Sequence, residues 1–268
     1  MIFMTVAVVW FNEAQRQIWC AADSRLSKGA GVLMDGGVKV FEVPVVCRKE
    51  AGEFNWVVTG DYSFGFVFSG SSISALSTHA IVVAMSKNLV ERQGEESSIC
   101  LEDIAKLFQF VGERQIKEIG ERLGATEHPS SCLFDCVVFG ICPKKRALLA
   151  FEVKTSIAEG VMSEIIVHEV GPGFCLAIGS GAETFNSMMK AGGKRVPPLT
   201  VLTKMLSEEV RPDVGGYLQA GVVGEGGFRV CPIIEKNSEN TLVASFLGIE
   251  AESVPIKGYV IGYLAVGA

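Results

Sequence analysis

The sequence has no block of basic residues and no basic stripe. Its 24 lysine and arginine residues are outnumbered by 30 aspartate and glutamate residues, which gives a formal net charge of −6. Because nucleic-acid-binding surfaces are rich in positive charge, a nucleic-acid partner is not expected. No apolar run reaches the roughly 18 residues that a membrane-spanning helix needs, and the opening MIFM lacks the charged start and apolar core of a signal peptide. We therefore expect a cytoplasmic protein with no membrane partner.

Cysteine and histidine follow none of the spacings that are typical of metal sites. The three histidines lie far apart, and Cys132 and Cys136 have no second cysteine pair or histidine at zinc-finger spacing. The eight cysteines occur in apolar contexts such as IWCAAD and FCLAIG, which favours buried, reduced thiols over a disulfide framework. The sequence thus implies no metal and no cofactor.

No proline- or serine-rich linker and no internal repeat divides the 268 residues. A chain of this length can bury a full hydrophobic core, and 49% hydrophobic with 20% charged residues is an ordinary globular balance. We therefore predict a single domain.

Hydrophobic periodicity and turn residues predict the order of the elements. The polar NEAQR joins two strand-like runs, so the chain is expected to open with a β-hairpin. Strands are predicted over residues 5–11, 17–23, 31–34, 38–46, 54–59, 132–141, 146–153, 162–169, 174–178, 217–223, 228–234, 241–247 and 257–265. Helices are predicted over residues 71–92, 101–123, 182–190 and 198–209. This order lacks the regular alternation of a doubly wound sheet and suits two face-to-face sheets with a pair of helices on each outer side.

Thr5 is a candidate nucleophile because it follows Met4. A methionine before a small residue is what a methionine aminopeptidase trims, so initiation at Met4 would leave Thr5 as the first residue. An N-terminal threonine carries a nucleophile and a base in one residue, the hydroxyl and the α-amine. The alternative is that Thr5 is a β-branched strand residue without a chemical role.

Several motifs, in order along the chain, resemble the proteasome β-subunit family and its bacterial relatives, among them the so-called ancestral β subunit. The early threonine is followed by ADSR, and Lys39 lies sixteen residues after Asp23. VVTGDYS, IGSG and DVGGYLQAGVV are similar to later motifs of the family. The resemblance covers roughly residues 5–223. It implies an N-terminal-nucleophile hydrolase of the α+β class, a four-layer αββα sandwich over residues 1–268, with about 224–268 as a β-rich C-terminal extension.

The resemblance assigns roles to the residues that match these motifs. The catalytic set that it implies is Thr5, Asp23, Lys39, Gly60, Ser180 and Asp213. In this set Gly60 supplies a backbone N–H to the oxyanion, and Ser180 hydrogen-bonds near the N-terminus. Arg25 and Ser27 are expected to line the substrate channel. Gly216 stands where the family often has a serine, which removes one hydroxyl from the support of the amine.

These residue types suit the chemistry of a threonine nucleophile. A free α-amine is partly neutral at pH 7 and can take the hydroxyl proton, through a water molecule. A lysine ammonium lowers the pKa of that amine further, and an aspartate keeps the lysine charged and oriented. Backbone N–H groups aimed at the oxyanion would stabilise the tetrahedral intermediate.

The function implied is a threonine-type peptidase that acts on peptides or unfolded proteins inside a ring-shaped homo-oligomer. Thr5 would need residues 1–4 to be absent, through initiation at Met4, self-cleavage or another protease, and the sequence leaves these routes open. It also leaves open whether an ATP-dependent unfoldase is a partner. Two alternatives remain: a non-catalytic proteasome-like structural or binding subunit, and hydrolysis of a small-molecule amide on the same fold.

Overall fold

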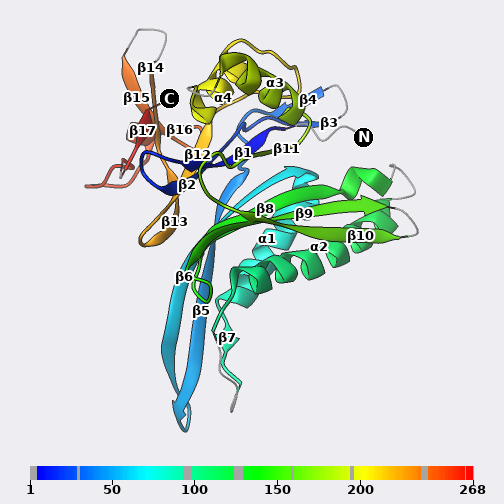
Figure 1. Ribbon diagram of the computed structural model, residues 1–268, viewed down its shortest axis with the longest axis vertical. Helices are drawn as coiled ribbons and strands as arrows, with labels where there is room; N and C mark the ends of the chain where they lie inside the picture. Colours follow the sequence, from blue (N-terminus) through cyan, green and yellow to red (C-terminus); the bar gives the residue numbers. More distant parts are fainter. Residues whose placement is uncertain are drawn as a thin grey trace.

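The computed structural model describes residues 5–28, 31–92, 98–123, 129–157, 160–193, 196–236, 241–262 and 264–267. In these ranges the chain is a mixed α/β protein with strands in several sheets and four α-helices (Figure 1). The helices are α1 (Ser72–Ser86), α2 (Leu101–Leu123), α3 (Ala182–Gly192) and α4 (Pro198–Ser207). None of the described helices is both long enough and apolar enough to cross a membrane.

Two sheets form the centre of the molecule. A five-stranded sheet has the order β11 (Cys175–Ile178), β1 (Ala7–Asn12), β2 (Gln17–Ala22), β12 (Gln219–Gly224), β13 (Gly227–Cys231). A six-stranded sheet has the order β10 (Val161–Glu169), β9 (Ala147–Ile157), β8 (Phe134–Cys142), β6 (Asn55–Gly70), β5 (Val40–Gly52), β7 (Leu89–Val90). All neighbouring strands are antiparallel except β5 and β7.

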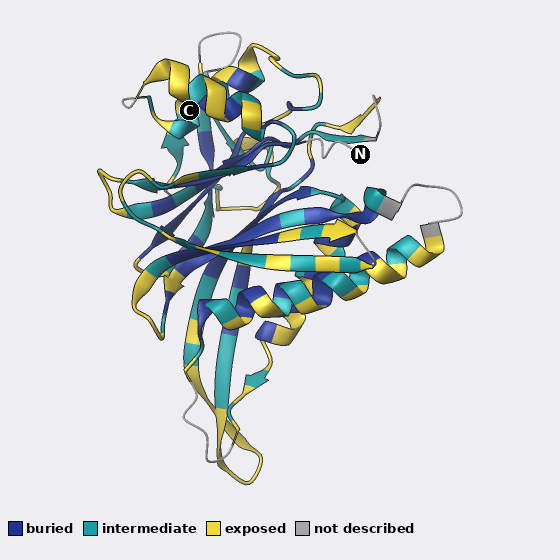
Figure 2. Ribbon diagram, turned by 45° about the vertical axis from the view of Figure 1, so that its right-hand side comes forward, coloured by how far each residue is buried: buried dark blue, intermediate teal, exposed yellow. Residues whose placement is uncertain are grey.

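Three hydrophobic clusters hold the helices and sheets together. Between the two sheets, the rings of Phe139 and Phe228 meet edge to face with centroids 5.5 Å apart. On the outer face of the six-stranded sheet, the ring of Phe66 stacks on that of Phe108 from α2 at 4.6 Å. On the outer face of the five-stranded sheet, Phe185 of α3 is buried in the third cluster. Buried residues accordingly run along both sheets, while exposed residues mark the outer helix faces (Figure 2).

The predicted opening hairpin is confirmed. β1 and β2 pair antiparallel, and the side chain of Asn12 accepts hydrogen bonds from the N–H groups of Ala14 and Gln15 in the turn. The side-chain oxygen thus satisfies two backbone donors that the tight turn leaves unpaired. The hairpin fixes the register that brings the residues before β1 next to those after β2.

The predicted helices are all present, but two boundaries were wrong. α1 ends at Ser86 rather than at 92, since the chain then turns into the short strand β7 beside β5. The strand predicted over 54–59 does not end at Gly60 but runs to Gly70, because residues 55–67 pair with β5 in one long hairpin and residues 65–70 pair with β8. Figure 1 shows this hairpin extending well beyond the helices.

The remaining differences from the predicted strands lie between β2 and β5 and in the C-terminal tail. β3 (Leu26–Lys28) pairs with β4 (Gly31–Met34), although only the second was predicted. The tail forms a further sheet of β16 (Ile249–Glu250), β15 (Leu242–Phe246), β14 (Ile233–Lys236) and β17 (Val266–Gly267). The strand predicted over 257–265 is wrong, because Tyr259 and Val260 are exposed and lie outside the strands that the structure describes.

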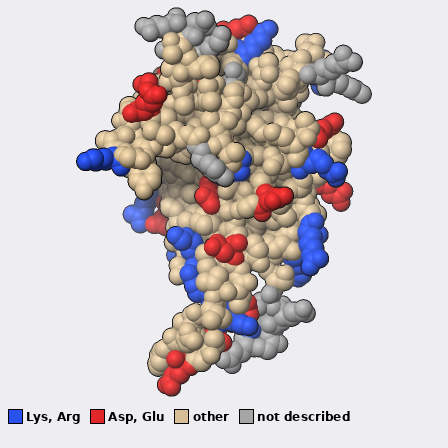
Figure 3. Space-filling view, turned by 90° about the vertical axis from the view of Figure 1, so that its left-hand side faces the viewer, with Lys and Arg blue, Asp and Glu red and all other residues tan. Residues whose placement is uncertain are grey.

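Acidic and basic side chains are interspersed on the face drawn in Figure 3. One stabilising arrangement is on α2, where Lys106 pairs with Glu102 one turn earlier at 2.9 Å. Exposed pairs of this kind contribute little to stability. The features that distinguish this chain lie instead in buried polar groups at one end of β1.

Candidate functional site

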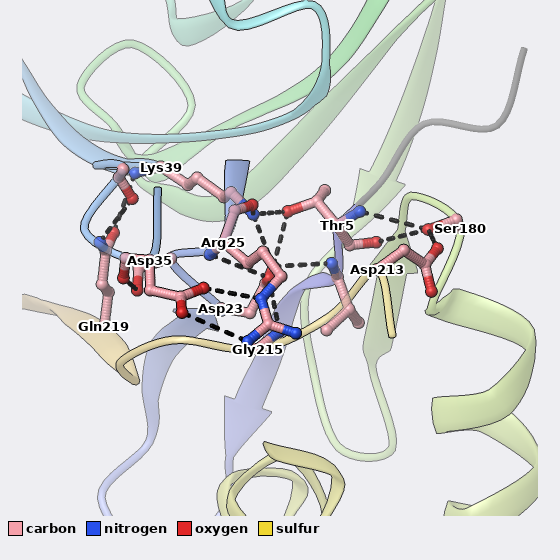
Figure 4. A network of polar contacts seen from close by, with 12 residues as sticks. Thr5, Asp23, Arg25, Asp35, Lys39, Ser180, Asp213, Gly215 and Gln219 are labelled. Atoms are coloured by element: carbon pink, nitrogen blue, oxygen red, sulfur yellow. Dashed lines mark hydrogen bonds and ion pairs between the residues drawn. The ribbon is translucent and has the colours of Figure 1, made fainter. Parts of the chain in front are cut away.

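The candidate site lies where β1 begins, between its two neighbouring strands. Ala7 pairs with Ala22 in β2 and with Ile178 in β11. Thr5, two residues before Ala7, therefore lies beside Asp23, the residue that follows β2. The backbone N–H of Asp23 donates to the carbonyl oxygen of Val6 at 3.2 Å, which continues the pairing. Figure 4 shows the polar network that this arrangement creates.

Thr5, Asp23 and Lys39 form its centre. The Thr5 hydroxyl donates to Asp23 Oδ1 at 2.6 Å. The Lys39 ammonium donates to Thr5 Oγ1, to Asp23 Oδ1 at 2.8 Å and to the carbonyl oxygen of Arg25 at 2.7 Å. All three ammonium N–H bonds thus have an acceptor, and one of these acceptors is the Thr5 hydroxyl.

The Asp23 carboxylate is fully buried, and backbone donors surround it. Its Oδ1 also accepts from the N–H of Val6 at 3.0 Å, and its Oδ2 accepts from the N–H groups of Arg25 at 3.2 Å and Gly215 at 3.1 Å. A buried charge is tolerated only when it is paired and hydrogen-bonded, and both conditions are met here. The carboxylate is therefore held in one orientation from three separate segments.

Burial lowers the pKa of the Lys39 ammonium, although the neighbouring Asp23 carboxylate opposes the shift. The backbone of Lys39 is fixed as firmly as its side chain. Its N–H donates to Gln219 Oε1 at 2.9 Å, and Gln219 Nε2 donates to the carbonyl oxygen of Gly37 at 2.9 Å. Gln219, itself buried on β12, was not predicted, since a lone glutamine in a strand carries no chemical signature.

Ser180 and Asp213 lie on the other side of Thr5. The backbone nitrogen of Thr5 donates to Ser180 Oγ at 3.2 Å, and Ser180 Oγ donates to Asp213 Oδ2 at 2.6 Å. Arg211 holds both Asp213 oxygens at 2.8 Å. Burial opposes ionisation of Asp213, but the hydrogen bonds from Arg211 and Ser180 outweigh it and lower the pKa of that carboxyl. Arg211 was not predicted, although it stands two residues before Asp213.

The glycines of IGSG allow the loop after β11 to touch Thr5. A Cβ on Gly179 would collide with Thr5 O and lie 2.9 Å from Thr5 Cγ2 and 3.1 Å from Ser69 Cβ, and its φ is +93°. The N–H of Gly181 donates to Thr5 O at 3.0 Å. Gly179 is therefore required for close approach as well as for its backbone conformation.

The two residues predicted to line a substrate channel, Arg25 and Ser27, follow Asp23 along the chain. The Arg25 guanidinium pairs with Asp35 at 2.6 Å, donates to the carbonyl oxygen of Pro212 at 3.0 Å and packs against Gly215. Only its backbone enters the centre described above. Ser27 Oγ is buried and has no hydrogen-bond partner within the described residues.

The structure does not bring Gly60 near Thr5, which corrects the role predicted for it as oxyanion donor. Gly60 pairs with Cys47, seven residues along β5 from the pair Val40–Val67, which is roughly 23 Å at the usual rise of a strand. The cause is the length of the hairpin, in which β6 continues to Gly70. Gly60 was predicted because VVTGDYS resembles the segment in which the family has a glycine after its fourth strand.

Gly70, at the end of β6, lies close to the site. It follows Ser69, whose Cβ lies beside Gly179, and it has a φ of +102°. The next residue, Ser71, caps the N-terminus of α1 and donates its N–H to the carbonyl oxygen of Leu133 at 2.8 Å. A glycine directly before a serine cap and a helix was the sequence signal for this position.

The glycine at position 216, where the family often has a serine, does more than remove a hydroxyl. Its φ is +77°, and a Cβ there would lie 2.5 Å from both the carbonyl oxygen of Asp35 and Ser24 Oγ. Ser24 Oγ donates to that same carbonyl oxygen and accepts from the N–H of Tyr217 at 2.6 Å. The space that a serine would need is thus filled by the hydroxyl of Ser24, which comes from the ADSR motif.

Side chains that could hold a metal ion are not grouped in the part of the chain that the structure describes: no three of His, Cys, Asp and Glu come together there. In the site itself, the lone pairs of Asp23 are taken by N–H and O–H donors. The arrangement is that of a hydroxyl between a carboxylate and an ammonium.

Comparison with known proteins supports the fold. No protein-family model and no curated protein matches the sequence. The structure is similar to that of Anbu, the ancestral beta-subunit, from Yersinia bercovieri, with a TM-score of 0.51 over 84% of this chain and 86% of that one, at 12% identity. The chain has a proteasome-like fold. At this identity the similarity concerns the arrangement of the backbone. It agrees with the fold that the sequence motifs led us to expect.

Proposed function

We propose that this chain is an N-terminal-nucleophile hydrolase that cleaves amide bonds with Thr5. The observation that carries the proposal is the position of Thr5 Oγ1, which is hydrogen-bonded to both Asp23 and Lys39. A threonine hydroxyl in an ordinary strand needs neither a buried carboxylate nor a buried ammonium. Burying both is costly unless they are well paired, so their presence at one hydroxyl favours chemistry over structure.

Nucleophilic attack needs the hydroxyl proton to move to a base. In this proposal the base is the α-amine of Thr5, which receives the proton through a water molecule. The Lys39 ammonium remains beside Oγ1 and stabilises the negative charge that develops there. Asp23 holds Lys39 in place and balances its charge.

The amine is oriented by Ser180. The Ser180 hydroxyl donates its hydrogen bond to Asp213, so that the lone pairs of Ser180 Oγ face the Thr5 nitrogen. Arg211 keeps Asp213 ionised and in position. This chain of hydrogen bonds would hold an α-amine with its own lone pair free to accept the hydroxyl proton.

The oxyanion donor in this proposal is the backbone N–H of Gly70, in place of Gly60. Ser71 directs its N–H towards β8, and neighbouring residues of an antiparallel strand direct theirs to opposite sides. The N–H of Gly70 is thereby aimed away from β8. The ladder between β6 and β5 begins only at the pair Val40–Val67, so it does not extend to Gly70. The position at the start of α1 adds the positive end of a helix dipole.

The remaining parts of the proposal follow from the resemblance. Residues 1–4, whose removal would free the amine, lie outside the described residues. We propose an αββα sandwich, since the three hydrophobic clusters alternate with two sheets and two helix pairs. The proposal further includes a single domain with about residues 224–268 as an extension, and a channel lined by Arg25 and Ser27. It also includes a homo-oligomeric ring in the cytoplasm that acts on peptides or unfolded proteins, with an unfoldase as a partner.

An electrophilic probe tests the proposal. A peptide epoxyketone reacts with a threonine that offers both a hydroxyl and a free amine, so it should add once to Thr5 in peptide mapping of the chain that begins at Thr5. Thr5→Ser keeps both groups and should retain the adduct, whereas Thr5→Ala should lose it. A folded chain that begins at Thr5 and takes no adduct would favour a structural or binding subunit. An adduct on Thr5 in a chain that does not cleave peptides would favour small-molecule amides as the substrates.

A further inference from the structure

Cys100 and Cys142 form a pair of thiols remote in sequence and close in space. All eight cysteines are reduced in the structure, and six of them are buried. Cys100 precedes α2, whereas Cys142 ends β8, and their sulfur atoms lie 3.4 Å apart. At this distance only a small movement separates the two thiols from the roughly 2.05 Å of a disulfide bond. Within the described residues, this is the one pair of cysteines whose sulfur atoms are in hydrogen-bond contact.

The surroundings of Cys142 favour its thiolate. Its sulfur accepts a hydrogen bond at 3.5 Å from the N–H of Leu101, the first residue of α2. Burial alone would raise the pKa of the Cys142 thiol. The hydrogen bonds from the backbone of Leu101 and Lys145, together with that from Cys100, outweigh this effect and lower it. A sulfur at a helix N-terminus with several N–H donors is the environment in which thiols become nucleophiles.

Cys100 is suited to the second role. Burial raises the pKa of its thiol, and it keeps its proton and can donate it to Cys142. Cys100 retains 6% of its surface in contact with solvent, whereas Cys142 has none. The small exposed fraction of the pair therefore belongs to Cys100, which favours a small oxidant over a bulky one.

We propose that Cys100 and Cys142 are a redox-active dithiol that hydrogen peroxide converts reversibly to a disulfide. The Cys142 thiolate attacks one peroxide oxygen, so that an S–O bond forms, the O–O bond breaks and the hydroxide that leaves is protonated by solvent. The Cys100 sulfur then attacks the Cys142 sulfur, the S–S bond forms and the S–O bond breaks. The departing hydroxide takes the thiol proton of Cys100. Two thiols lose two electrons, and one peroxide becomes two waters.

The product would join the first turn of α2 to the end of β8. The link closes a long loop of chain that includes the whole of α2, and closing a long loop restricts the unfolded state most. A thiol reductant would reverse the reaction by thiol–disulfide exchange. The proposal concerns a modification site distant in sequence from Thr5 and does not depend on its activity.

Peptide mapping of the reduced, full-length chain after titration with hydrogen peroxide tests this proposal. The expected result is a linked peptide that contains Cys100 and Cys142, with loss of alkylation at both and recovery after dithiothreitol. Cys175 is exposed and serves as the internal control. Oxidation of Cys175 while Cys100 and Cys142 still alkylate fully would overturn the proposal.

Two variants sharpen the test. Cys100→Ser should stop the reaction at the sulfenic acid, so that dimedone present while the oxidised chain is denatured labels Cys142. Absence of that label in a variant with an unchanged circular dichroism spectrum would contradict the role of Cys142 as the attacking thiol. Cys175→Ser should form the link as the wild type does. Thr5→Ala should do so too, which separates this result from that for the proposed hydrolase.

Discussion

Lys39 and Asp23 form an ion pair of 2.8 Å in which neither side chain has appreciable contact with solvent. Both partners are also bound to the hydroxyl of Thr5. The pair thus joins the beginning of β5 to the end of β2 at the one point where β1 starts. The free energy of this network and its chemistry can be tested separately.

Replacing Lys39 with alanine leaves the Asp23 carboxylate buried without its counter-charge. Breaking a buried pair in this way typically costs about 3–5 kcal/mol of unfolding free energy, which urea denaturation would measure. The epoxyketone adduct on Thr5 should be lost as well. Lys204→Ala is the control, because Lys204 is exposed and its pair with Glu208 spans 3.7 Å. Labelling of a folded Lys39→Ala chain at the wild-type rate would contradict the role of the ammonium.

Asp213 should make stability depend on pH. Because its pKa is lower in the folded chain than in the unfolded chain, the unfolded chain binds more protons as the pH falls through the region of about 4 and below. The contribution of Asp213 is therefore complete at neutral pH and is lost on acidification. Thermal unfolding of wild type and Asp213→Asn from pH 7 to pH 3 should show a difference that shrinks. A difference independent of pH would contradict the ionised state.

Gly179→Ala should disturb Thr5 more than its backbone conformation alone explains. A positive φ at a non-glycine residue costs about 1–3 kcal/mol, and the added methyl would also collide with Thr5. Gly173→Ala is the matched control, since Gly173 has a φ of +83° and open space around its Cβ position. We expect both variants to lose stability and only Gly179→Ala to lose the adduct on Thr5. Equal labelling of the two would show that the close approach is unimportant.

Introducing serine at Gly216 should not improve the site. The new Cβ would lie 2.5 Å from the carbonyl oxygen of Asp35 and from Ser24 Oγ, so Gly216→Ser should destabilise the chain beyond the cost of φ. Gly193→Ser measures that cost alone, because Gly193 has a φ of +74° and nothing near its Cβ position. A Gly216→Ser chain more stable or more reactive than wild type would contradict this account of Ser24.

Thr5, Asp23 and Lys39 could be named together because they match motifs of the family that the sequence resembles, and local rules account for part of their proximity. A polar turn fixes the hairpin register, and the register places Thr5 beside Asp23, while Lys39 enters at the start of the next long strand. Gly60 was misplaced because nothing in an apolar, β-branched run marks where a long hairpin ends. Gln219 and Ser24 act on residues far apart in sequence, so their roles depend on tertiary contacts that no local pattern contains.

The central claim is that Thr5 works only as the first residue of the chain. Two forms of the protein test it: one produced to begin at Thr5, and one that retains residues 1–4, with intact mass recorded before and after the assay. We predict that only the form beginning at Thr5 cleaves a fluorogenic peptide amide and takes the epoxyketone on Thr5. Equal turnover by a form whose mass shows residues 1–4 still attached throughout would contradict the account.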